Sequence, residues 1–284
     1  MATSTGEQWS PNDYVTHASF VPALASRVVS LLAPQPTDHI LDIGAGDGIL
    51  SIAIASQAAT VHCTDGSRHM VEYAATRVAE GKIKNVTTEV VDAGTEVKEK
   101  VPAGKYNKVF SNAAYHWIFG SLSSADARAK AFQDVYDILP PGGEFVVECG
   151  GHGNVGEILV ALVSTVTSVW ARKGVVKTYA EIKETLSPWY FATNAEIAGW
   201  LQAAGFKIEL LEREYRPTTL NNGDIGMKGW IDTFGFPFWE GLNDEEKNAV
   251  ISEAVELLRV ADWLEHEGKW VAGYVRCRFK AIKE

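Results

Sequence analysis

The sequence predicts an α/β fold with a mainly parallel sheet and helices on both faces. Between residues 39 and 150, short apolar runs typical of buried strands alternate with segments of helical periodicity. The first run, residues 39–43, passes through three closely spaced glycines into a helical segment, which is the strand–turn–helix unit of parallel sheets. In such sheets ligands bind beyond the carboxyl ends of the strands, so we expect the functional residues there.

The strands and helices of this sheet come from the first half of the chain. Apolar runs predict strands at residues 39–43, 60–65, 86–93, 107–114 and 144–151. Helical periodicity predicts helices at about 9–32, 49–56, 67–81 and 124–138. Ser67 and Gly81 bound the third helix as N-cap and C-terminal stop, and Pro34 follows the first.

The alternation of strands and helices loosens after Gly150. We expect helices at about 155–173, 194–205 and 244–268, strands at 206–215 and 270–283, an aromatic loop at 187–191, and an aromatic, glycine-rich insert at 221–242. The sequence therefore predicts a single domain, residues 1–284, in which cap elements at approximately 9–33, 155–191 and 221–266 cover one side of the sheet. Asn194 is the expected N-cap of its helix, and Gly205 ends it.

Composition limits the classes of partner. The chain has 284 residues, of which 46% are hydrophobic and 22% charged, as in ordinary globular proteins. A formal net charge of −10 without any basic run argues against a nucleic-acid or anionic-membrane surface. The 3 cysteines are far apart and predict neither disulfides nor a metal site. No apolar run resembles a secretory signal or a membrane span, so we expect a cytoplasmic protein.

The first strand ends in a glycine turn flanked by acids. Gly44, Gly46 and Gly48 let the backbone turn tightly and approach a ligand, which then meets the free N–H groups of the following helix. Asp42 and Asp65 end the first two strands beside this turn. Such a pair of acids suits a ligand with an adenosine, whose ribose offers two hydroxyls. A turn that only connects strand and helix is the plainer alternative.

The spacing of these glycines distinguishes between two families. Dinucleotide-binding folds need G-x-G-x-x-G, but Ile49 stands where the third glycine of that pattern belongs. The order D-x-G-x-G-x-G resembles the class I S-adenosylmethionine (SAM)-dependent methyltransferases. Over its whole length the chain is most similar to the trans-aconitate methyltransferase-like branch, through the segments QWSPNDY, VFSNAAYHWI, PWYF, GWIDTFGFPF and WVAGYVRCRFKA. This resemblance implies a Rossmann-like class I methyltransferase fold, with a seven-stranded, mostly parallel sheet, an antiparallel last strand and a helical cap.

The resemblance also implies SAM as the cofactor and a set of residues that bind it. It places Gly44 and Gly46 at the methionine moiety, whose ammonium Asp42 holds. It places Asp65, with Gly66 beside it, at the ribose hydroxyls, although Asp65 is also suited to cap the helix at Ser67. The remaining implied positions are Met70 packing on the adenine, Asp92 and Ala93 at the adenine edge, Asn112 beneath the sulfonium, and Tyr14 with Trp9 as a lid.

The implied reaction is an in-line displacement on a small-molecule acceptor, most simply O-methylation of a carboxylic acid such as trans-aconitate. A carboxylate is already ionised and needs no general base, whereas a hydroxyl or thiol would gain from one. His116 and His152 follow strands at the catalytic edge and are the candidate catalytic residues. Trp117, Trp189, Tyr190 and Trp230, with Phe234, are candidates for the acceptor pocket, and each is equally suited to the core.

Three arginines are candidates for binding an acidic acceptor: Arg216, Arg276 and Arg278. The last two alternate along the final strand with apolar residues, so one face of that strand is polar. A solvated edge strand explains this pattern as well as anion binding does.

Other functions remain open at this point. The acceptor of a methyltransferase can be an oxygen, nitrogen or sulfur atom of a secondary metabolite. A non-catalytic SAM-binding regulator is an alternative of another class, and an NAD-dependent oxidoreductase is a further one. No metal is expected, and the sequence specifies neither the acceptor nor the oligomeric state.

Overall fold

A computed structural model describes residues 25–221 and 223–284. Its centre is a sheet with the strand order β3-β2-β1-β4-β5-β8-β6, and the short β7 pairs with β8. The strands are β1 (His39–Ile43), β2 (Thr60–Asp65), β3 (Val86–Val90), β4 (Lys108–Asn112), β5 (Glu144–Gly150), β6 (Phe206–Thr219), β7 (Trp263–Leu264) and β8 (Lys269–Lys283). Strands β1 to β5 are parallel, and β8 is antiparallel to β5 and β6. The predicted fold class is confirmed.

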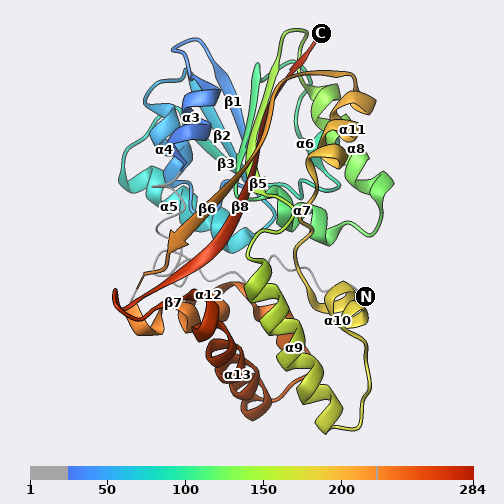
Figure 1. The fold of residues 1–284 in the computed structure, drawn as a ribbon. Coiled ribbons are helices and arrows are strands. Elements are labelled where there is room, and N and C mark those ends of the chain that lie inside the picture. Colours follow the sequence, from blue (N-terminus) through green and yellow to red (C-terminus); the bar gives the residue numbers. More distant parts are fainter. Residues whose placement is uncertain (1–24, 222) are drawn as a thin grey trace.

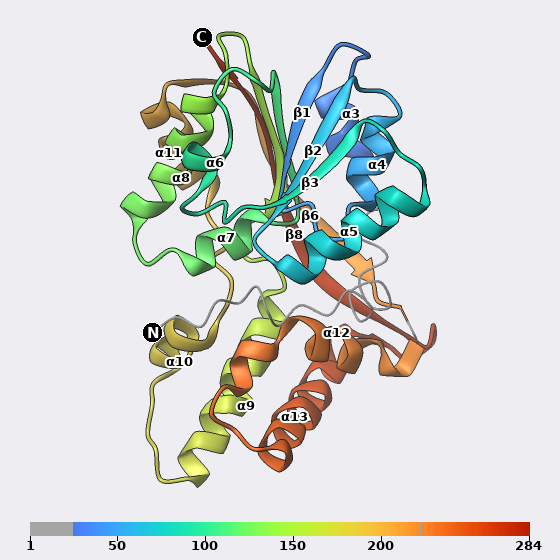
Figure 2. The same cartoon turned by 180° about the vertical axis from the view of Figure 1, so that it is seen from behind.

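Helices cover both faces of the sheet (Figures 1 and 2). Helices α3, α4 and α5 lie on one face, and α6, α7, α8 and α11 lie on the other. The helices are α3 (Ser26–Leu32), α4 (Ile49–Ala55), α5 (Arg68–Glu80), α6 (Val97–Lys100), α7 (Tyr115–Ser121), α8 (Ala125–Ile138), α9 (Gly156–Arg172), α10 (Tyr179–Leu186), α11 (Asn194–Ala204), α12 (Gly226–Phe234) and α13 (Asp244–Asp262).

The alternation of side chains along the central strands builds two separate cores. Val109 of β4 packs in a cluster with α8 and α11, whereas its neighbour Phe110 packs in a second cluster with α3 and α4. Successive strand residues point to opposite faces, so a run of apolar residues such as this one is buried on both sides. The strands are thereby fixed in place, and their carboxyl ends form a stable edge.

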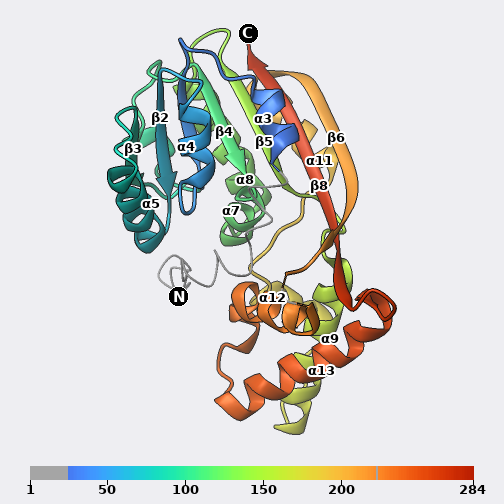
Figure 3. The same ribbon diagram turned by 90° about the vertical axis from the view of Figure 1, so that its left-hand side faces the viewer.

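A third apolar cluster forms a cap beyond that edge. It contains residues of α9, α10, α12 and α13 together with the first half of β8, including Trp270 and Tyr274. Figures 1 and 3 show this cap below the sheet, with the long strands β6 and β8 running from one to the other. Residues 25–33 belong to the predicted cap but lie elsewhere, because Val28 and Leu32 of α3 pack on the sheet.

Some elements differ from the sequence-based expectations. Helix α7 occupies a segment between β4 and α8 for which no element was expected, and a further helix, α10, precedes the aromatic loop. Thr193 caps α11 in place of Asn194, because its hydroxyl accepts the N–H of Glu196, whose carboxylate accepts the N–H of Thr193. Helix α13 stops at Asp262 and β6 extends to Thr219. None of the helices in the described ranges combines the length and apolarity that crossing a membrane requires.

The interpretation of β8 as a solvated edge strand is wrong. Strand β8 lies between β5 and β6, so both of its edges are paired with neighbouring strands. Arg276 is 4% exposed and Arg278 is 1% exposed. Burying the positive charge of an arginine is costly, so the groups that compensate the charges of Arg276 and Arg278 have to be identified.

Candidate functional site

The three glycines of the first turn all adopt left-handed backbone conformations, with φ of 69° at Gly44, 58° at Gly46 and 74° at Gly48. A Cβ at Gly44 would collide with that of Ala114, and a Cβ at Gly48 would lie 2.9 Å from that of Ala74. A Cβ at Gly46 would meet nothing within 4 Å. Packing therefore excludes a side chain at Gly44 and Gly48, and the positive φ favours glycine at all three positions. At Gly46, however, the position of a Cβ faces open space.

Asp65 joins this turn to the start of α5. Its Oδ2 accepts the N–H of Gly46 at 3.0 Å, and its Oδ1 accepts the N–H of Ser67 at 2.8 Å. Burial raises the pKa of Asp65, and the two N–H bonds oppose this shift. The contact of Asp65 with the start of α5, which the sequence suggested as an alternative role, is thus present. Each carboxylate oxygen nevertheless retains a lone pair for a further donor. The neighbouring Gly66 has nothing within 4 Å of its Cβ position, which leaves room for a ribose.

Asp42 lies beneath the turn and is 2% exposed. The hydroxyl of Ser51 in α4 donates to its Oδ2. Burial raises the pKa of Asp42 to about 7. A positive group next to this carboxylate would lower its pKa and favour the ionised form. The contact between Asp42 and the ammonium group of SAM stays a prediction.

The other predicted cofactor residues surround the same edge. Met70 is buried at the start of α5, and Asn112 is half-buried at the end of β4. Asp92 is exposed in the loop after β3, where its Oδ1 accepts the N–H of Gly94 at 2.8 Å, and Ala93 packs against the core. Tyr14 and Trp9 lie outside the described residues. Three features of this edge fit SAM. The carboxylate of Asp65 suits the two hydroxyls of a ribose, the space over Gly46 is open, and apolar side chains such as Met70 lie nearby.

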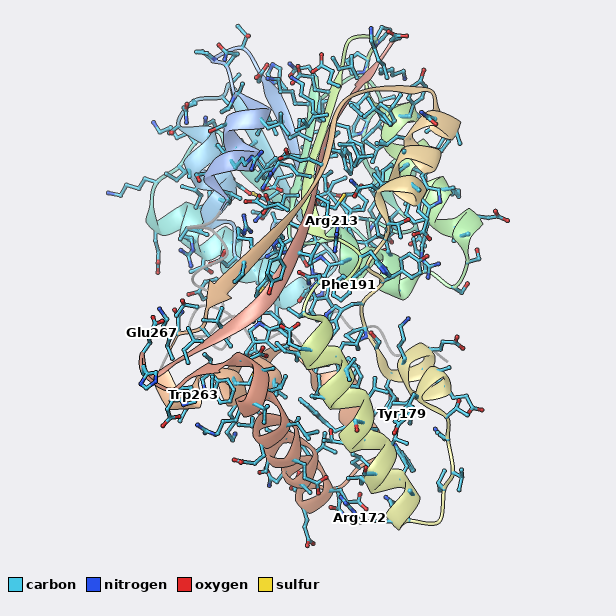
Figure 4. The ribbon with its side chains drawn as sticks, viewed as in Figure 1. Arg172, Tyr179, Phe191, Arg213, Trp263 and Glu267 are labelled. Carbon is cyan, nitrogen blue, oxygen red and sulfur yellow. The ribbon has the colours of Figure 1, made fainter. Side chains whose placement is uncertain are left out.

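A cavity lies between this edge and the cap. It is lined by Ala113, His116, Trp117, Asn154, Val155, Trp189, Phe191, Trp230, Phe234, Tyr274 and Arg276. Figure 4 shows Phe191 near the start of α9, between the sheet and the cap. Because a Cβ at Gly44 would meet Ala114, next to the lining residue Ala113, the cavity and the glycine turn are adjacent.

The cavity includes four of the five predicted acceptor-pocket residues: Trp117, Trp189, Trp230 and Phe234. Tyr190 does not line it, because its hydroxyl donates to Glu196 and its ring lies under the guanidinium of Arg128 at 3.8 Å. His152 is exposed outside the cavity.

His116 lines the cavity as a neutral donor. It is 7% exposed, and its Nδ1 accepts the N–H of Gly150 at 3.2 Å. The proton of the neutral ring is therefore on Nε2, which is free to donate. Burial, together with the charge of Arg276, lowers the pKa of His116 to about 3. The structure thus favours the hydrogen-bonding role considered for His116 over that of a base.

Arg276 is the charged group that faces this cavity. Its partner in register on β5 is Gly150, which has no side chain to cover it. The guanidinium lies 4.7 Å from the centre of the Tyr274 ring, and its nearest carboxylate, that of Glu148, is 3.9 Å from Nε. Its Nε has no hydrogen-bond partner within the part of the chain that the structure describes. Burial lowers the pKa of Arg276.

The other two candidate arginines are held by acids. Arg278 donates to Glu148, Glu212 and Glu214, and Arg216 donates to Glu148 at 2.9 Å. The three arginines that the sequence grouped together therefore differ, and Arg276 alone among them lines the cavity.

Sequence reasoning did not single out Asn154, which also lines the cavity. It is 3% exposed, and its Oδ1 accepts the N–H of Val275 at 2.9 Å, so its amide nitrogen is left as a donor. Its position directly after β5, in the segment GGHGN, is the signal that could have indicated it. No cluster of three or more side chains suited to a metal ion occurs in the described ranges.

Comparison with known proteins agrees with this arrangement. A family model described as a methyltransferase domain matches residues 40–143. An uncharacterized methyltransferase of Schizosaccharomyces pombe is 32% identical over 278 residues, which are 98% of this chain and 99% of that protein.

Solved structures share the fold. A putative methyltransferase of Bacillus halodurans has a TM-score of 0.61 at 15% identity, with 92% of this chain and 99% of that chain covered. The YcgJ protein of Bacillus subtilis has a TM-score of 0.59 at 15% identity, with 91% and 98% covered. The chain therefore belongs to the class I SAM-dependent methyltransferases, enzymes whose methyl donor is SAM.

Proposed function

We propose that this methyltransferase transfers the methyl group of SAM to the carboxylate of a small organic acid. The observation that carries the proposal is Arg276, a buried cation that lines the cavity and has no hydrogen-bonded acid among the described residues, since the carboxylate of Glu148 is 3.9 Å from its Nε. A buried charge whose ion pair is this long is costly, and an acceptor that brings its own carboxylate offsets this cost. The resemblance to the trans-aconitate methyltransferase-like branch favours the same class of acceptor.

The residues of the cavity are arranged to orient a carboxylate. SAM, when bound, supplies a methyl group on a sulfonium that leaves as a neutral sulfide. Arg276 and the Nε2–H of His116 offer donors to the acceptor, and charge-assisted hydrogen bonds of this kind fix geometry. The cavity reaches Ala113, the residue after Asn112, so the acceptor lies next to the predicted position of the sulfonium.

The electrostatics favour a carboxylate over other acceptors. A carboxylate is ionised at neutral pH and needs no base, and His116, with a pKa of about 3, is poorly suited to act as one. The positive charge of Arg276 disfavours an ammonium group beside it. A phenol or thiol would need a proton acceptor near pH 7, which the described lining residues do not provide.

The charge of Arg276 has a specific kinetic consequence. It attracts the ionised acceptor more strongly than the transition state, in which the negative charge of the acceptor is partly neutralised. Loss of the guanidinium should therefore raise the KM for the acid more than it lowers kcat.

The test is Arg276→Gln, assayed with methyl-labelled SAM and a panel of small carboxylic acids. We expect kcat/KM for the acid to fall about 10- to 100-fold, mainly through KM, with the KM for SAM unchanged. Arg213→Gln is the matched control, because Arg213 lies on β6 outside the cavity and bonds the carbonyl of His152 (Figure 4). Unchanged kinetics toward the acid, or an effect confined to SAM, would contradict the proposal.

A further inference from the structure

Aromatic side chains make up more than half of the described residues that line the cavity. Four of them contact one another in a closed circuit, which we call the aromatic wall: Trp117, Trp189, Trp230 and Phe234. The centroid distances along the circuit are 5.6, 5.9, 5.0 and 6.4 Å. The indole N–H of Trp230 donates to the hydroxyl of Tyr274 at 2.6 Å, so this polar edge is satisfied within the protein. The ring faces of the wall are apolar and suit the hydrocarbon part of an acceptor.

The described part of the cavity lining offers one charge. Of the described lining residues, Arg276 is the charged one, since His116 has a pKa of about 3. Arg278 and Arg216 lie close by in the sheet but donate to glutamates. One carboxylate of the acceptor can thus pair with Arg276, whereas a second would find no further cation among the described lining residues. The neutral side chains of His116 and Asn154 offer N–H donors, and the rest of the lining is mostly ring faces. Those faces carry partial negative charge, which adds repulsion.

From this we infer that the acceptor is a monocarboxylic acid with an apolar body, whose carboxylate pairs with Arg276 while its hydrocarbon part packs on the aromatic wall. The inference rests on the proposed function and narrows it. It departs from trans-aconitate, which the resemblance implies, because a tricarboxylate would leave two further charges unpaired in this cavity.

The position of Arg276 also weighs against a zwitterionic acceptor. Aromatic rings can hold an ammonium group, and an amino acid or a similar acceptor would combine that contact with the arginine. In this cavity, however, the guanidinium of Arg276 lies over the ring of Tyr274, at 4.7 Å from its centre, and Tyr274 is bonded to Trp230 of the wall. A second cation against the wall would lie close to the first and be repelled.

The test is a series of acids that each contain six carbons, assayed with the wild-type enzyme and methyl-labelled SAM. Sorbate and muconate share the same conjugated chain and differ in that a carboxylate of muconate replaces the methyl group of sorbate. Trans-aconitate represents the tricarboxylates in this series, and 6-aminohexanoate represents the zwitterions. We expect kcat/KM for sorbate to exceed that of each of the others by about 100-fold or more, because each places an unpaired charge against the rings.

The outcomes separate this inference from the proposed function. Comparable or higher kcat/KM with muconate or trans-aconitate overturns the monocarboxylate inference but leaves carboxyl methylation standing. A preference for 6-aminohexanoate overturns it in favour of an acceptor with a cation on the wall. Absence of a methyl ester from all four acids, with SAM binding shown by titration, overturns the proposed function as well.

Discussion

The difference between Arg276 and Arg278 shows how single residues acquire a role here. They are two positions apart on β8 and point to the same face. Arg278 lies opposite Glu148 on β5 and Glu212 on β6, whereas Arg276 lies opposite Gly150 and Glu214. Since Glu214 bonds Arg278, Arg276 keeps its charge for the cavity. The sequence shows the alternation, but the pairing of distant strands decides which arginine is neutralised.

Asp65 gives a test of the cofactor site at the residue scale. We expect Asp65→Ala to weaken SAM binding by about 100-fold, because two charge-assisted hydrogen bonds to the ribose would be lost. Isothermal titration of SAM and S-adenosylhomocysteine measures this effect. Asp126→Ala in α8, an exposed acid remote from the turn, is the control. Equal affinities of wild type and Asp65→Ala would remove Asp65 from the site.

His116 gives a second residue-scale prediction, on stability against pH. Its folded pKa of about 3 lies below the ordinary histidine pKa of 6.5, so between these pH values the unfolded chain binds a proton that the folded protein excludes. Stability therefore falls as the pH drops below 6.5, by about 2 kcal/mol from this group at pH 5. In His116→Asn the loss of stability between pH 7 and pH 5 should shrink by about that amount.

Urea unfolding at pH 5 and pH 7 measures this change, and an identical pH dependence in the mutant would contradict the low pKa. The same low pKa predicts that kcat of the wild type stays flat from about pH 6.5 upward, since neither His116 nor the acid acceptor titrates there. A limb with a pKa near 6.5 that disappears in the mutant would instead identify His116 as a base.

At the scale of elements, the contact between α7 and the aromatic loop positions the cavity. A Cβ at Gly120 of α7 would overlap the carbonyl of Pro188, and the N–H of Tyr190 bonds the carbonyl of His116 at 3.0 Å. The glycine thus lets the loop carrying Trp189 lie directly on the helix. No sequence pattern specifies this contact, because it joins segments about 70 residues apart.

Gly120→Ala tests that contact. We expect it to destabilise the protein by about 1–3 kcal/mol and to lower kcat/KM for the acceptor, because Pro188 and Trp189 must move. Gly199→Ala in α11 is the matched control, since nothing lies within 4 Å of its Cβ position. In this control, alanine should stabilise the helix by up to about 1 kcal/mol. If urea unfolding gave equal changes in the free energy of unfolding for the two substitutions, close packing of the loop on Gly120 would be contradicted.

The strands and long helices were largely predictable because their patterns are local. Helix α13 begins where Asn243 and Glu246 form a capping box, and the apolar runs of β1, β2 and β5 match the observed strands. Helix α7 was missed because its seven residues, Tyr115–Ser121, are too few for a helical period to emerge. The covered position of β8 was missed for another reason, because strand order is set by long-range pairing.

At the scale of the whole molecule, the proposed reaction takes place between the sheet and the cap. The sheet provides the glycine turn and Asp65, while the cap provides Trp230, Phe234 and the start of α9. Strand β8 belongs to both, because its first half packs in the cap and its second half pairs with β5. Arg276 lies near the middle of this strand, so the cation is held at the boundary where acceptor and SAM are proposed to meet.

The central claim is that the methyl group is transferred to a carboxylate held by Arg276. The most direct measurement is the stability in mild alkali of the labelled product formed from methyl-labelled SAM and the best acceptor. A methyl ester is hydrolysed and releases the label as methanol, which is the result that we predict. A label that survives the same treatment, as an ether, a methylamine or a thioether does, would contradict the claim.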